Sequence, residues 1–409
     1  MRRIGAGALV ATLAAALLAG PATPAATAQN DQLRQVLFVG NNWDGTVDVL
    51  TADGELDRVG SLNVVPDRTQ RLIEIYLNPI RLVFFLAIRQ LIGEGNDQFV
   101  DDMYTSPDGQ LLIVSRPSLA DVAAINIRTG RLAWRFPVSG LRSDHMALSP
   151  DGRQVAVSAS TGNVVHLLDV ATGREVGRFP TGDSPHENTY IGGGRHIVNA
   201  SIGTVYTPLD HPLLDTTKGE RFFQIYDRDT NQVVKRIDMS AKLAAAGHPN
   251  MSAAVRPMTF SPDERFVYFQ VSFFHGFVEY DLQLDQVTRV AELPNLVPNL
   301  PRSSYLLDSA HHGIVMNTAG TKICVAGTMS DYATIVSRTT FQNQGLVRAG
   351  QKPYWATRSA DGNLCFVSWS GTDTISAISY ATGQEVARAD VGDHPQRMRL
   401  GFVSRNWPN

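Results

Sequence analysis

The sequence predicts an all-β fold, a seven-bladed β-propeller closed by pairing N-terminal strands with the C-terminal strand. The first observation is a turn that recurs along the chain, as Ser106-Pro107-Asp108-Gly109, Ser149-Pro150-Asp151-Gly152, Ser261-Pro262-Asp263-Glu264 and Ser359-Ala360-Asp361-Gly362. The second is that an apolar, β-rich segment follows each copy. Repeats of about 40 to 45 residues with four short strands each are typical of propeller blades.

The two ends of the chain determine the number of blades. Full blades are expected to begin near residues 101, 144, 186, 256, 312 and 354, which makes six. Gln396–Phe402 has the pattern of a first strand with nothing after it. Three early segments have the pattern of later strands with no first strand before them: Val36–Gly40, Thr46–Leu50 and Leu56–Leu62. Together they complete a seventh blade, and their pairing removes the free sheet edges of an open array.

The composition excludes several classes of protein. The 409 residues include 36 Lys and Arg against 39 Asp and Glu, and this near-neutral balance argues against a polyanion-binding protein, so no nucleic acid partner is expected. Two cysteines cannot build a disulfide framework or a four-cysteine zinc site. Cys324 and Cys365 fall on the second strands of neighbouring blades. Because packed sheets lie about 10 Å apart, we expect two buried free thiols.

Residues 1–28 are predicted to be a cleaved signal peptide. Arg2 and Arg3 form a basic start, an apolar stretch runs from Ile4 to Leu18, and Ala26-Thr27-Ala28 supplies small residues at the cleavage site. This layout is typical of secretory signal peptides. We expect residues 29–409 to form a single propeller domain that works in a secreted or extracytoplasmic location, and we expect no transmembrane span.

The repeat also carries family motifs. They are Ser149-Pro150-Asp151-Gly152, Leu168-Asp169 with Thr172-Gly173, Thr181-Gly182-Asp183-Ser184-Pro185, and the strand–turn–strand Val367-Ser368-Trp369-Ser370-Gly371-Thr372-Asp373-Thr374-Ile375-Ser376. With these motifs, most of residues 36–402 resemble the YVTN/YncE-like family of exported bacterial seven-bladed β-propellers. The resemblance implies the fold. It does not define the activity, because one fold supports many functions.

Two segments interrupt the repeat. Residues 66–98 are apolar with helical periodicity, a break at Pro79 and several interspersed charges, so this insertion is expected to be helical. Packing over the propeller rim is one interpretation, and a lid, membrane-surface docking, self-association or contact with a partner are the others. Residues 206–221 are expected to form a long loop over one face.

Candidate functional residues occur where the blades begin. The first strand of each blade lines the central channel of a propeller, so residues just before the recurring turns should meet at one mouth. At the position five residues before each turn lie Asp101, Asp144, His186, Arg256, His312, Tyr354 and Gln396. At the next position lie Asp102, His145, Glu187, Pro257, Gly313, Trp355 and Arg397, with His311 just upstream of His312. Such crowded charges and imidazoles require one another, water, a metal ion or a ligand.

Three interpretations of this ring are open. In the first, His145, His186, and His311 or His312 hold a divalent transition metal such as Zn, Cu, Mn or Fe, together with Glu187 or Asp102. In the second, Arg256 and Arg397 bind an organic anion against Tyr354 and Trp355, and a histidine oriented by Glu187 acts as a general base. In the third, the ring is a structural plug of ion pairs.

These interpretations lead to three candidate functions. The first is binding of a small ligand or metal ion in the pocket, with Asp102, Asp144, Arg256, Tyr354, Trp355 and Arg397 as the ligand-binding set. The second is a metal-assisted lyase, oxidase or hydrolase with His145, His186, Glu187 and His312 as catalytic residues. The third is a protein-interaction scaffold that docks through residues 66–98. A divalent transition metal is the candidate cofactor.

Overall fold

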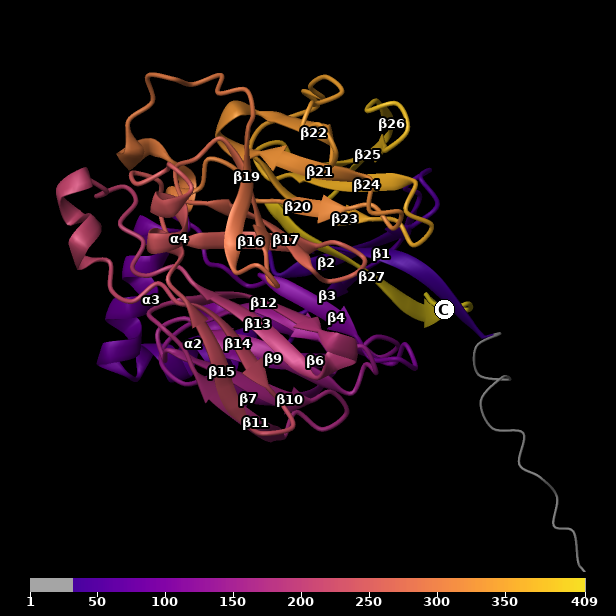
Figure 1. Ribbon diagram of the computed structural model, residues 1–409. Helices are drawn as coiled ribbons and strands as arrows, with labels where there is room; N and C mark the ends of the chain where they lie inside the picture. The colour runs from indigo at the N-terminus through magenta and orange to yellow at the C-terminus, as the bar shows by residue number, and fades with distance from the viewer. Residues whose placement is uncertain (1–31, 409) are drawn as a thin grey trace, which may run out of the picture. The chain divides into compact units, whose positions relative to one another are not determined.

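The structure is a computed structural model that describes residues 32–408. Within this range the strands form seven antiparallel sheets, six of four strands and one of three. The innermost strands β4, β8, β12, β16, β20, β23 and β27 contact one another in that order, and β27 in turn contacts β4. This closed ring is a seven-bladed β-propeller, which confirms the predicted fold class (Figure 1).

The closing blade combines both ends of the described chain. Its strands are β27 (Pro395–Ser404), β1 (Leu33–Asn41), β2 (Thr46–Thr51) and β3 (Arg58–Asn63). β27 pairs antiparallel with β1, with Leu37 opposite Leu400. The innermost strand of this blade therefore comes from the C-terminus and the other three come from the N-terminus.

The other six blades follow one another along the chain. They consist of β4 (Asp102–Thr105), β5 (Leu111–Arg116), β6 (Asp121–Asn126) and β7 (Leu132–Pro137); β8 (Ser143–Leu148), β9 (Gln154–Ala159), β10 (Val164–Asp169) and β11 (Glu175–Pro180); β12 (Pro185–Ile191), β13 (His196–Ser201), β14 (Phe223–Asp227) and β15 (Gln232–Ile237); β16 (Val255–Phe260), β17 (Phe266–Val271), β18 (Gly276–Asp281) and β19 (Gln286–Glu292); β20 (Ile314–Met316), β21 (Lys322–Gly327) and β22 (Tyr332–Ser337); and β23 (Pro353–Arg358), β24 (Leu364–Trp369), β25 (Thr374–Ser379) and β26 (Glu385–Asp390).

The recurring turn connects the first and second strands of a blade. In the β8–β9 turn, the Ser149 hydroxyl donates to Asp151 at 2.6 Å and accepts the backbone N–H of Gln154 at 3.0 Å. Gly152 has a φ of 69°, which favours glycine. The serine–aspartate hydrogen bond is repeated at Ser106, Ser261 and Ser359. The motif therefore stabilises the tight turn that returns the chain from the channel.

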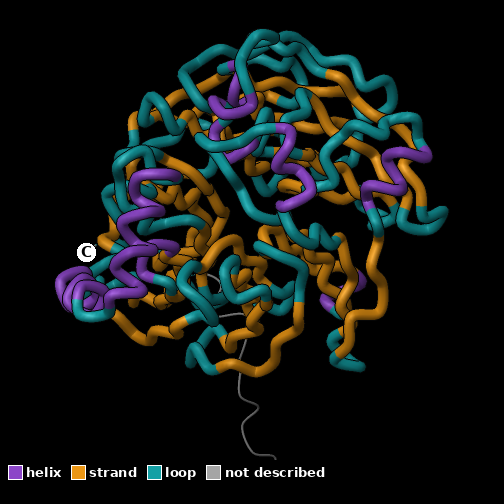
Figure 2. Tube along the Cα trace, turned by 90° about the vertical axis from the view of Figure 1, so that its left-hand side faces the viewer, coloured by secondary structure: helices purple, strands orange, loops and turns teal. Residues whose placement is uncertain are grey.

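The insertion after the closing blade forms a helical hairpin. Its helices are α2 (Arg68–Tyr76) and α3 (Pro79–Leu91), and the Asn78 side chain caps α3 by accepting the backbone N–H of Arg81. The predicted break therefore falls at Pro79, which occupies the first turn of α3, where a proline is tolerated. Helix α4 (Met239–Ala245) and the short helix η3 (Pro212–Thr217) lie in other connections. Most helical segments gather over one face of the propeller, which faces the viewer in Figure 2.

The prediction of two free thiols was wrong, because Cys324 and Cys365 form a disulfide. Their Cα atoms are 6.4 Å apart, and the bond joins β21 to β24 in neighbouring blades. The blades radiate from a common axis, so their separation falls toward the channel and is not the spacing of two stacked flat sheets. Both cysteines lie in the buried core between these blades.

Among the described helices, none is long and apolar enough to cross a membrane. The signal peptide predicted for residues 1–28 lies outside the described residues.

Candidate functional site

Backbone bulges bring the predicted residues together at the channel. Pairing in the innermost strands shifts register between Ser143 and Met146, Pro185 and Asn188, Val255 and Met258, and Pro353 and Ala356. The pairing of β27 shifts in the same way around Gln396 and Arg397. Each bulge contains two adjacent residues of the predicted ring. Because a bulge redirects side chains, both members of a pair such as Asp144 and His145 reach the channel interior.

Three histidines converge inside the channel. His145, His186 and His312 come from or directly precede three different innermost strands, β8, β12 and β20, and all are buried. One ring nitrogen from each lies within 4.8 Å of the other two. The ring centroids of His145 and His186 are 3.6 Å apart. Two nitrogens on one tetrahedral zinc ion lie about 3.3 Å apart, so the three rings could share an ion once their side chains move closer together.

In two of these histidines, the Nδ1 atom contacts an oxygen atom. Nδ1 of His145 lies 2.6 Å from Glu187 Oε2, and Nδ1 of His312 lies 3.2 Å from the backbone oxygen of Tyr354. The Tyr354 carbonyl can only accept a hydrogen bond, so Nδ1 of His312 carries the proton and its Nε2 lone pair is free. The Glu187 carboxylate favours the same tautomer of His145. Nε2 of His312 and Nδ1 of His186 are buried without a hydrogen-bond partner. Carboxylate and carbonyl acceptors orient metal-binding histidines in this way.

Burial keeps the three imidazoles neutral. Loss of solvation lowers the pKa of His145, His186 and His312 well below the ordinary value, and nearby arginines lower it further. Arg397 acts on His145 and His312, whereas Arg256 acts most strongly on His186. A neutral imidazole has the lone pair that a metal ion needs.

Two aspartates border the histidine cluster. Asp101, Asp144 and His145 each place one polar atom within 4.8 Å of the others. Asp144 Oδ1 is 3.4 Å from His145 Nε2. Burial raises the pKa of Asp144 to about 8, and the neighbouring Asp101 adds to the increase. Burial likewise raises the pKa of Glu187 to about 7.

Asp102 is held by hydrogen bonds that connect neighbouring strands. Its carboxylate accepts two hydrogen bonds at 2.9 Å from Arg399 and further ones from the backbone N–H groups of Met103 and Met146. The sequence analysis had assigned Asp102 to ligand binding. The structure places it in an arginine–aspartate pair that joins β27 to β4 and β8.

Arg397 is buried beside the histidines without a hydrogen bond. Its side chain is 0% exposed, and none of its three nitrogens has a partner. Its Nε lies 3.7 Å from Asp101 and 3.9 Å from Asp102, and its guanidinium carbon lies 3.8 Å from the Trp355 ring centroid. Trp355 therefore contacts Arg397, and of the two predicted wall residues Tyr354 lines the cavity above the histidine cluster, whereas Trp355 lines a different pocket.

A cavity of about 220 Å³ opens above the cluster. Its polar side includes Asp101, Arg142, Asp144, His145, His186, Arg256 and Tyr354. Its apolar side consists of Phe84, Ile88, Ile92, Ile202, Val205 and Leu307. Arg256 donates to Ser272 and to the backbone oxygen of Leu307, and the Tyr354 ring stacks on His312 at 4.0 Å. The cavity therefore connects the histidine cluster with the helical hairpin.

His311 does not join the cluster, although the sequence analysis included it as a candidate metal ligand. Its Nε2 lies 3.1 Å from the Tyr332 hydroxyl, and its ring packs at 5.4 Å from His275. His311 and His312 are consecutive residues before β20, and their side chains point to different surroundings. Only His312 reaches the channel cluster.

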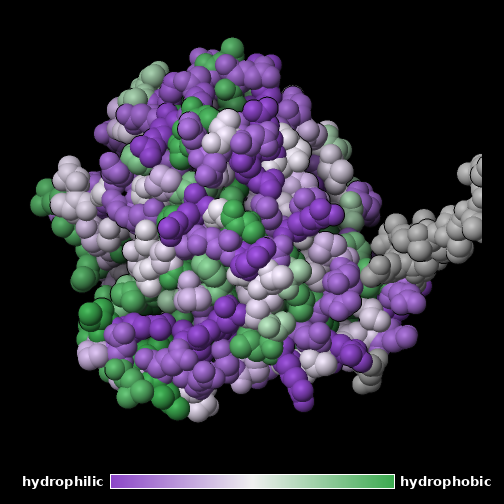
Figure 3. All heavy atoms as spheres, turned by 90° about the horizontal axis from the view of Figure 1, so that it is seen from below, coloured by the Kyte–Doolittle hydropathy of each residue, from purple (hydrophilic) through white to green (hydrophobic). Residues whose placement is uncertain are grey.

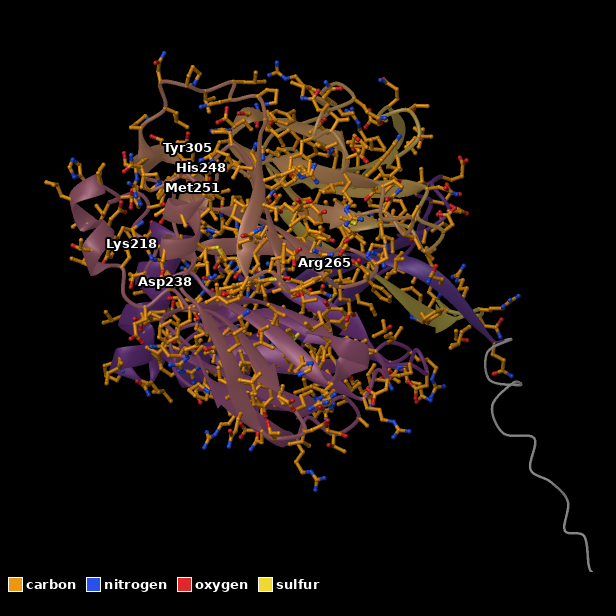
Figure 4. All side chains as sticks on the ribbon, in the orientation of Figure 1. Lys218, Asp238, His248, Met251, Arg265 and Tyr305 are labelled. Carbon is orange, nitrogen blue, oxygen red and sulfur yellow. A yellow bond between two sulfur atoms is a disulfide. The ribbon has the colours of Figure 1, made fainter. Side chains whose placement is uncertain are left out.

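The residues that cover the cavity could not be identified from the sequence. Phe84, Ile88 and Ile92 belong to or directly follow α3, and Val205 precedes the second insertion. Nothing in the local sequence indicates which helical face covers the mouth. Lys218 of the second insertion pairs with Asp308 at 2.8 Å, beside the cavity residue Leu307. Lys218 and Tyr305, labelled in Figure 4, lie on the same side of the molecule.

Comparison with known proteins supports a β-propeller family. Residues 119–255, about a third of the chain, match the family described as outer membrane protein assembly factor BamB. The matched segment runs from η1 (Pro117–Leu119) to the start of β16 and so covers propeller blades. No curated protein matches the chain. Together with the seven sheets of the described residues, the match supports assignment to a β-propeller family, and the YVTN/YncE-like resemblance stays a prediction.

Proposed function

We propose that this propeller binds a divalent transition metal ion through His145, His186 and His312, and a small ligand in the cavity above them. The observation that carries the proposal is the convergence of three buried, neutral imidazoles whose nitrogens lie within 4.8 Å of one another. Imidazole ligands suit Zn, Cu, Fe and Ni. A structural plug of ion pairs accounts less well for histidine nitrogens that are buried without partners.

Asp144 is suited to be a fourth ligand. Its Oδ1 lies 3.4 Å from His145 Nε2. Two ligand atoms on one tetrahedral zinc ion, each about 2.0–2.1 Å from the metal, lie about 3.3 Å apart. Glu187 would act behind His145 by accepting its Nδ1 proton and fixing the ring orientation. A bound metal ion would supply a Lewis acid that the cavity exposes to the ligand.

The same geometry supports a metal-assisted enzyme as a second candidate function. The observation that favours it is that His145, His186 and Asp144 line a cavity rather than a closed core. Catalytic metal sites keep a position open for water or substrate, whereas structural sites are closed. His145, His186, Glu187 and His312 would then form the catalytic set.

Metal analysis of two histidine variants tests the metal site. Purified protein is loaded with Zn, Cu or Co in turn, dialysed and analysed by plasma mass spectrometry. We expect near-stoichiometric metal in the native protein and loss of metal in His312→Ala and His186→Ala. The matched control is His311→Ala, because His311 is equally buried and next in sequence but contacts Tyr332. Native protein without retained metal, or equal losses in His311→Ala and His312→Ala, would refute the proposal.

We also propose that the protein is exported. The disulfide between Cys324 and Cys365 supports this, because such bonds persist in oxidising compartments and are rare in the cytosol. The match to a family described as outer membrane protein assembly factor BamB is consistent with an extracytoplasmic location. Mass spectrometry of the protein recovered from the extracytoplasmic fraction should show cleavage after Ala28. Intact protein starting at Met1 in the cytosolic fraction alone would contradict export.

A further inference from the structure

The Arg397 guanidinium is a buried cation that lacks an acceptor. It is 0% exposed, and Nε, Nη1 and Nη2 are all without hydrogen-bond partners. The Asp102 carboxylate already binds Arg399 through two hydrogen bonds, so it is a poor partner for Arg397. The second oxygen of Asp101, 3.7 Å away, is also without a hydrogen bond. Buried donors of this kind are normally satisfied by protein, water or a ligand.

The position of Arg397 points to an anion beside the metal-binding residues. Gln396, its neighbour in the chain, lines the cavity. Trp355, which Arg397 contacts, lines a pocket on the far side of the channel. Arg397 therefore lies between the two openings, and among the charged groups it lowers the pKa of His145 and His312 most. A metal ion bound to these histidines would add further positive charge, and an anion would stabilise both cations.

We propose that the ligand is a small organic carboxylate. Its carboxylate lies between the histidine cluster and Arg397, and its apolar body occupies the cavity beneath α3. A guanidinium offers paired N–H donors that match a carboxylate. Phe84, Ile88 and Leu307 supply the apolar wall. The cavity of about 220 Å³ is smaller than most drug-binding pockets, which limits the ligand to a few carbon atoms. This inference rests on the proposed ligand-binding function and specifies its ligand class.

A matched acid and amide test the ligand class. Butyrate and butyramide have nearly the same shape and differ in charge, so we would measure both by isothermal titration calorimetry on the metal-loaded protein. We expect butyrate to bind about 10- to 100-fold more tightly, as hydrogen bonds to charged groups imply. Equal affinities, or no binding of any straight-chain acid from acetate to hexanoate, would overturn the inference.

Two variants at Arg397 connect the preference to this residue. Arg397→Met keeps the side-chain bulk and removes the charge, so the preference for butyrate should disappear. Arg397→Lys keeps the charge without the paired donors and should retain part of it. Arg358→Met, on the far side of the channel, is the control. A folded Arg397→Met protein that prefers butyrate over butyramide as strongly as the native protein would refute the assignment.

Metal content measured on the same samples separates the two proposals. A metal-free protein that still prefers butyrate refutes only the metal site.

A second inference comes from the helical hairpin, whose exposed surface is mainly apolar. From Ile73 to Leu91 the charged side chains are paired: Glu74 with Arg71 and Arg135, Arg81 with the Leu119 backbone oxygen, and Arg89 with Asp97. The exposed side chains of the hairpin include Ile73, Tyr76, Leu77, Ile80, Val83, Leu86 and Leu91, each at least 40% exposed. An apolar face of this kind marks an interaction site.

The same face has a second apolar projection. Leu209 and Leu213, 68% and 82% exposed, belong to the other insertion, which begins just after the cavity residue Val205. In Figure 3 hydrophobic residues gather at separate places along the left edge, the side on which Figure 1 draws α3 and η3. Two projections from different insertions therefore flank the cavity mouth. The charged side chains among them, such as Glu74 and Asp215, are paired, so the projections offer a partner mainly apolar surface.

We infer that these projections dock the cavity mouth onto the surface of a lipid bilayer. Hydrocarbon requires no directional contacts, and separate apolar projections suit a flat, deformable surface. At 13 residues α3 is too short to span a bilayer and suits the interface. The apolar surface of α3 continues from the exterior into the cavity, which supports a lipid bilayer as the docking partner. Val83 and Leu86 point outward, and Phe84 and Ile88 line the cavity.

Vesicle flotation tests the docking surface. The chain from residue 29 onward is mixed with phosphatidylcholine vesicles, with and without phosphatidylglycerol, and we expect it to float with both. Leu77→Glu with Ile80→Glu should abolish flotation and leave metal content unchanged. Val234→Glu with Val386→Glu, at similarly exposed residues on outer strands, is the control. Flotation of the hairpin variant would refute the inference. A native protein that stays with the soluble fraction would also refute it, whether the protein is a monomer or a dimer formed through this face.

Discussion

Glu187 orients the His145 ring in the histidine cluster. Its carboxylate lies 2.6 Å from Nδ1 of the ring, so Nε2 is the nitrogen that could bind the proposed metal ion. We predict that Glu187→Gln retains the fold and lowers metal affinity by about 10- to 100-fold, the usual effect of losing such an outer partner. Competition with a chromophoric chelator measures this change.

The chain contains a matched control for this substitution. Glu175 lies 2.8 Å from Nδ1 of His166, so it makes the same kind of contact away from the channel cluster. Glu175→Gln should therefore leave metal affinity unchanged. An equal change of affinity in both variants would show that the effect of Glu187→Gln is not local to the site.

At this scale, residue spacing predicted much of the site. Counting back from the recurring turns identified His145, His186 and His312, because each blade starts at a similar distance from its turn. The orientation of adjacent residues could not be predicted, since strict alternation would send Asp144 and His145 to opposite faces. The bulge between Ser143 and Met146 overrides this alternation, and no residue in the sequence marks it.

The helical hairpin is attached to its neighbouring blade by a buried ion network. Asp121, 0% exposed, binds Arg116 at 2.7 Å and Arg71 of α2 at 3.1 Å, and Arg116 also binds Asp67 at 2.6 Å. We predict that Asp121→Asn lowers the free energy of unfolding by about 3 kcal/mol, because two buried guanidinium groups each lose the carboxylate that they share. Urea denaturation measures the loss.

An exposed ion pair provides the comparison at the same scale. Glu94 and Lys352 pair at 2.8 Å with both side chains more than a third exposed. Glu94→Gln should change the free energy of unfolding by less than about 1 kcal/mol, as exposed pairs do. If Asp121→Asn has an effect this small, the network does not hold the hairpin in place.

The elements differ in how well the sequence predicts them. The hairpin was predicted with its break at Pro79, because its apolar periodicity extends over several turns. Helix α4, with 7 residues, was missed, since one or two turns are too few for a periodic pattern. The segment between β19 and β20 was also missed, although its Leu307 contributes to the cavity.

The disulfide between β21 and β24 stabilises two neighbouring blades of the ring. Cys324 and Cys365 are 41 residues apart in sequence. A loop of this length implies that replacing both by alanine lowers the free energy of unfolding by about 2–4 kcal/mol. Guanidinium denaturation of the double variant measures the change, and native protein kept in reductant should show a similar loss. Unchanged stability in both experiments would mean that the bridge does not contribute.

For the whole molecule, the sequence predicts the number of blades but not their spacing. Recurring turns and the incomplete patterns at both ends are local features, and counting them is sufficient for seven. The distance between blades depends on how wedge-shaped sheets pack around an axis. The free-thiol prediction used the spacing of flat sheets and was therefore wrong.

The stability of the whole ring is expected to depend on its closing strand. β27 supplies the innermost strand of a blade whose other strands come from the N-terminus. Removing residues 395–409 exposes the edge of β1 and takes Arg397 from the channel, so we expect the cooperative thermal transition to be lost. A circular permutant distinguishes strand pairing from chain order. Leu33 pairs with Ser404, so a short glycine–serine linker can join the ends, and new ends placed between Arg128 and Thr129 lie in an exposed turn. The permutant should unfold at or above the native midpoint by differential scanning calorimetry. A truncated protein that unfolds at the native midpoint would show that the ring is stable without its closing strand.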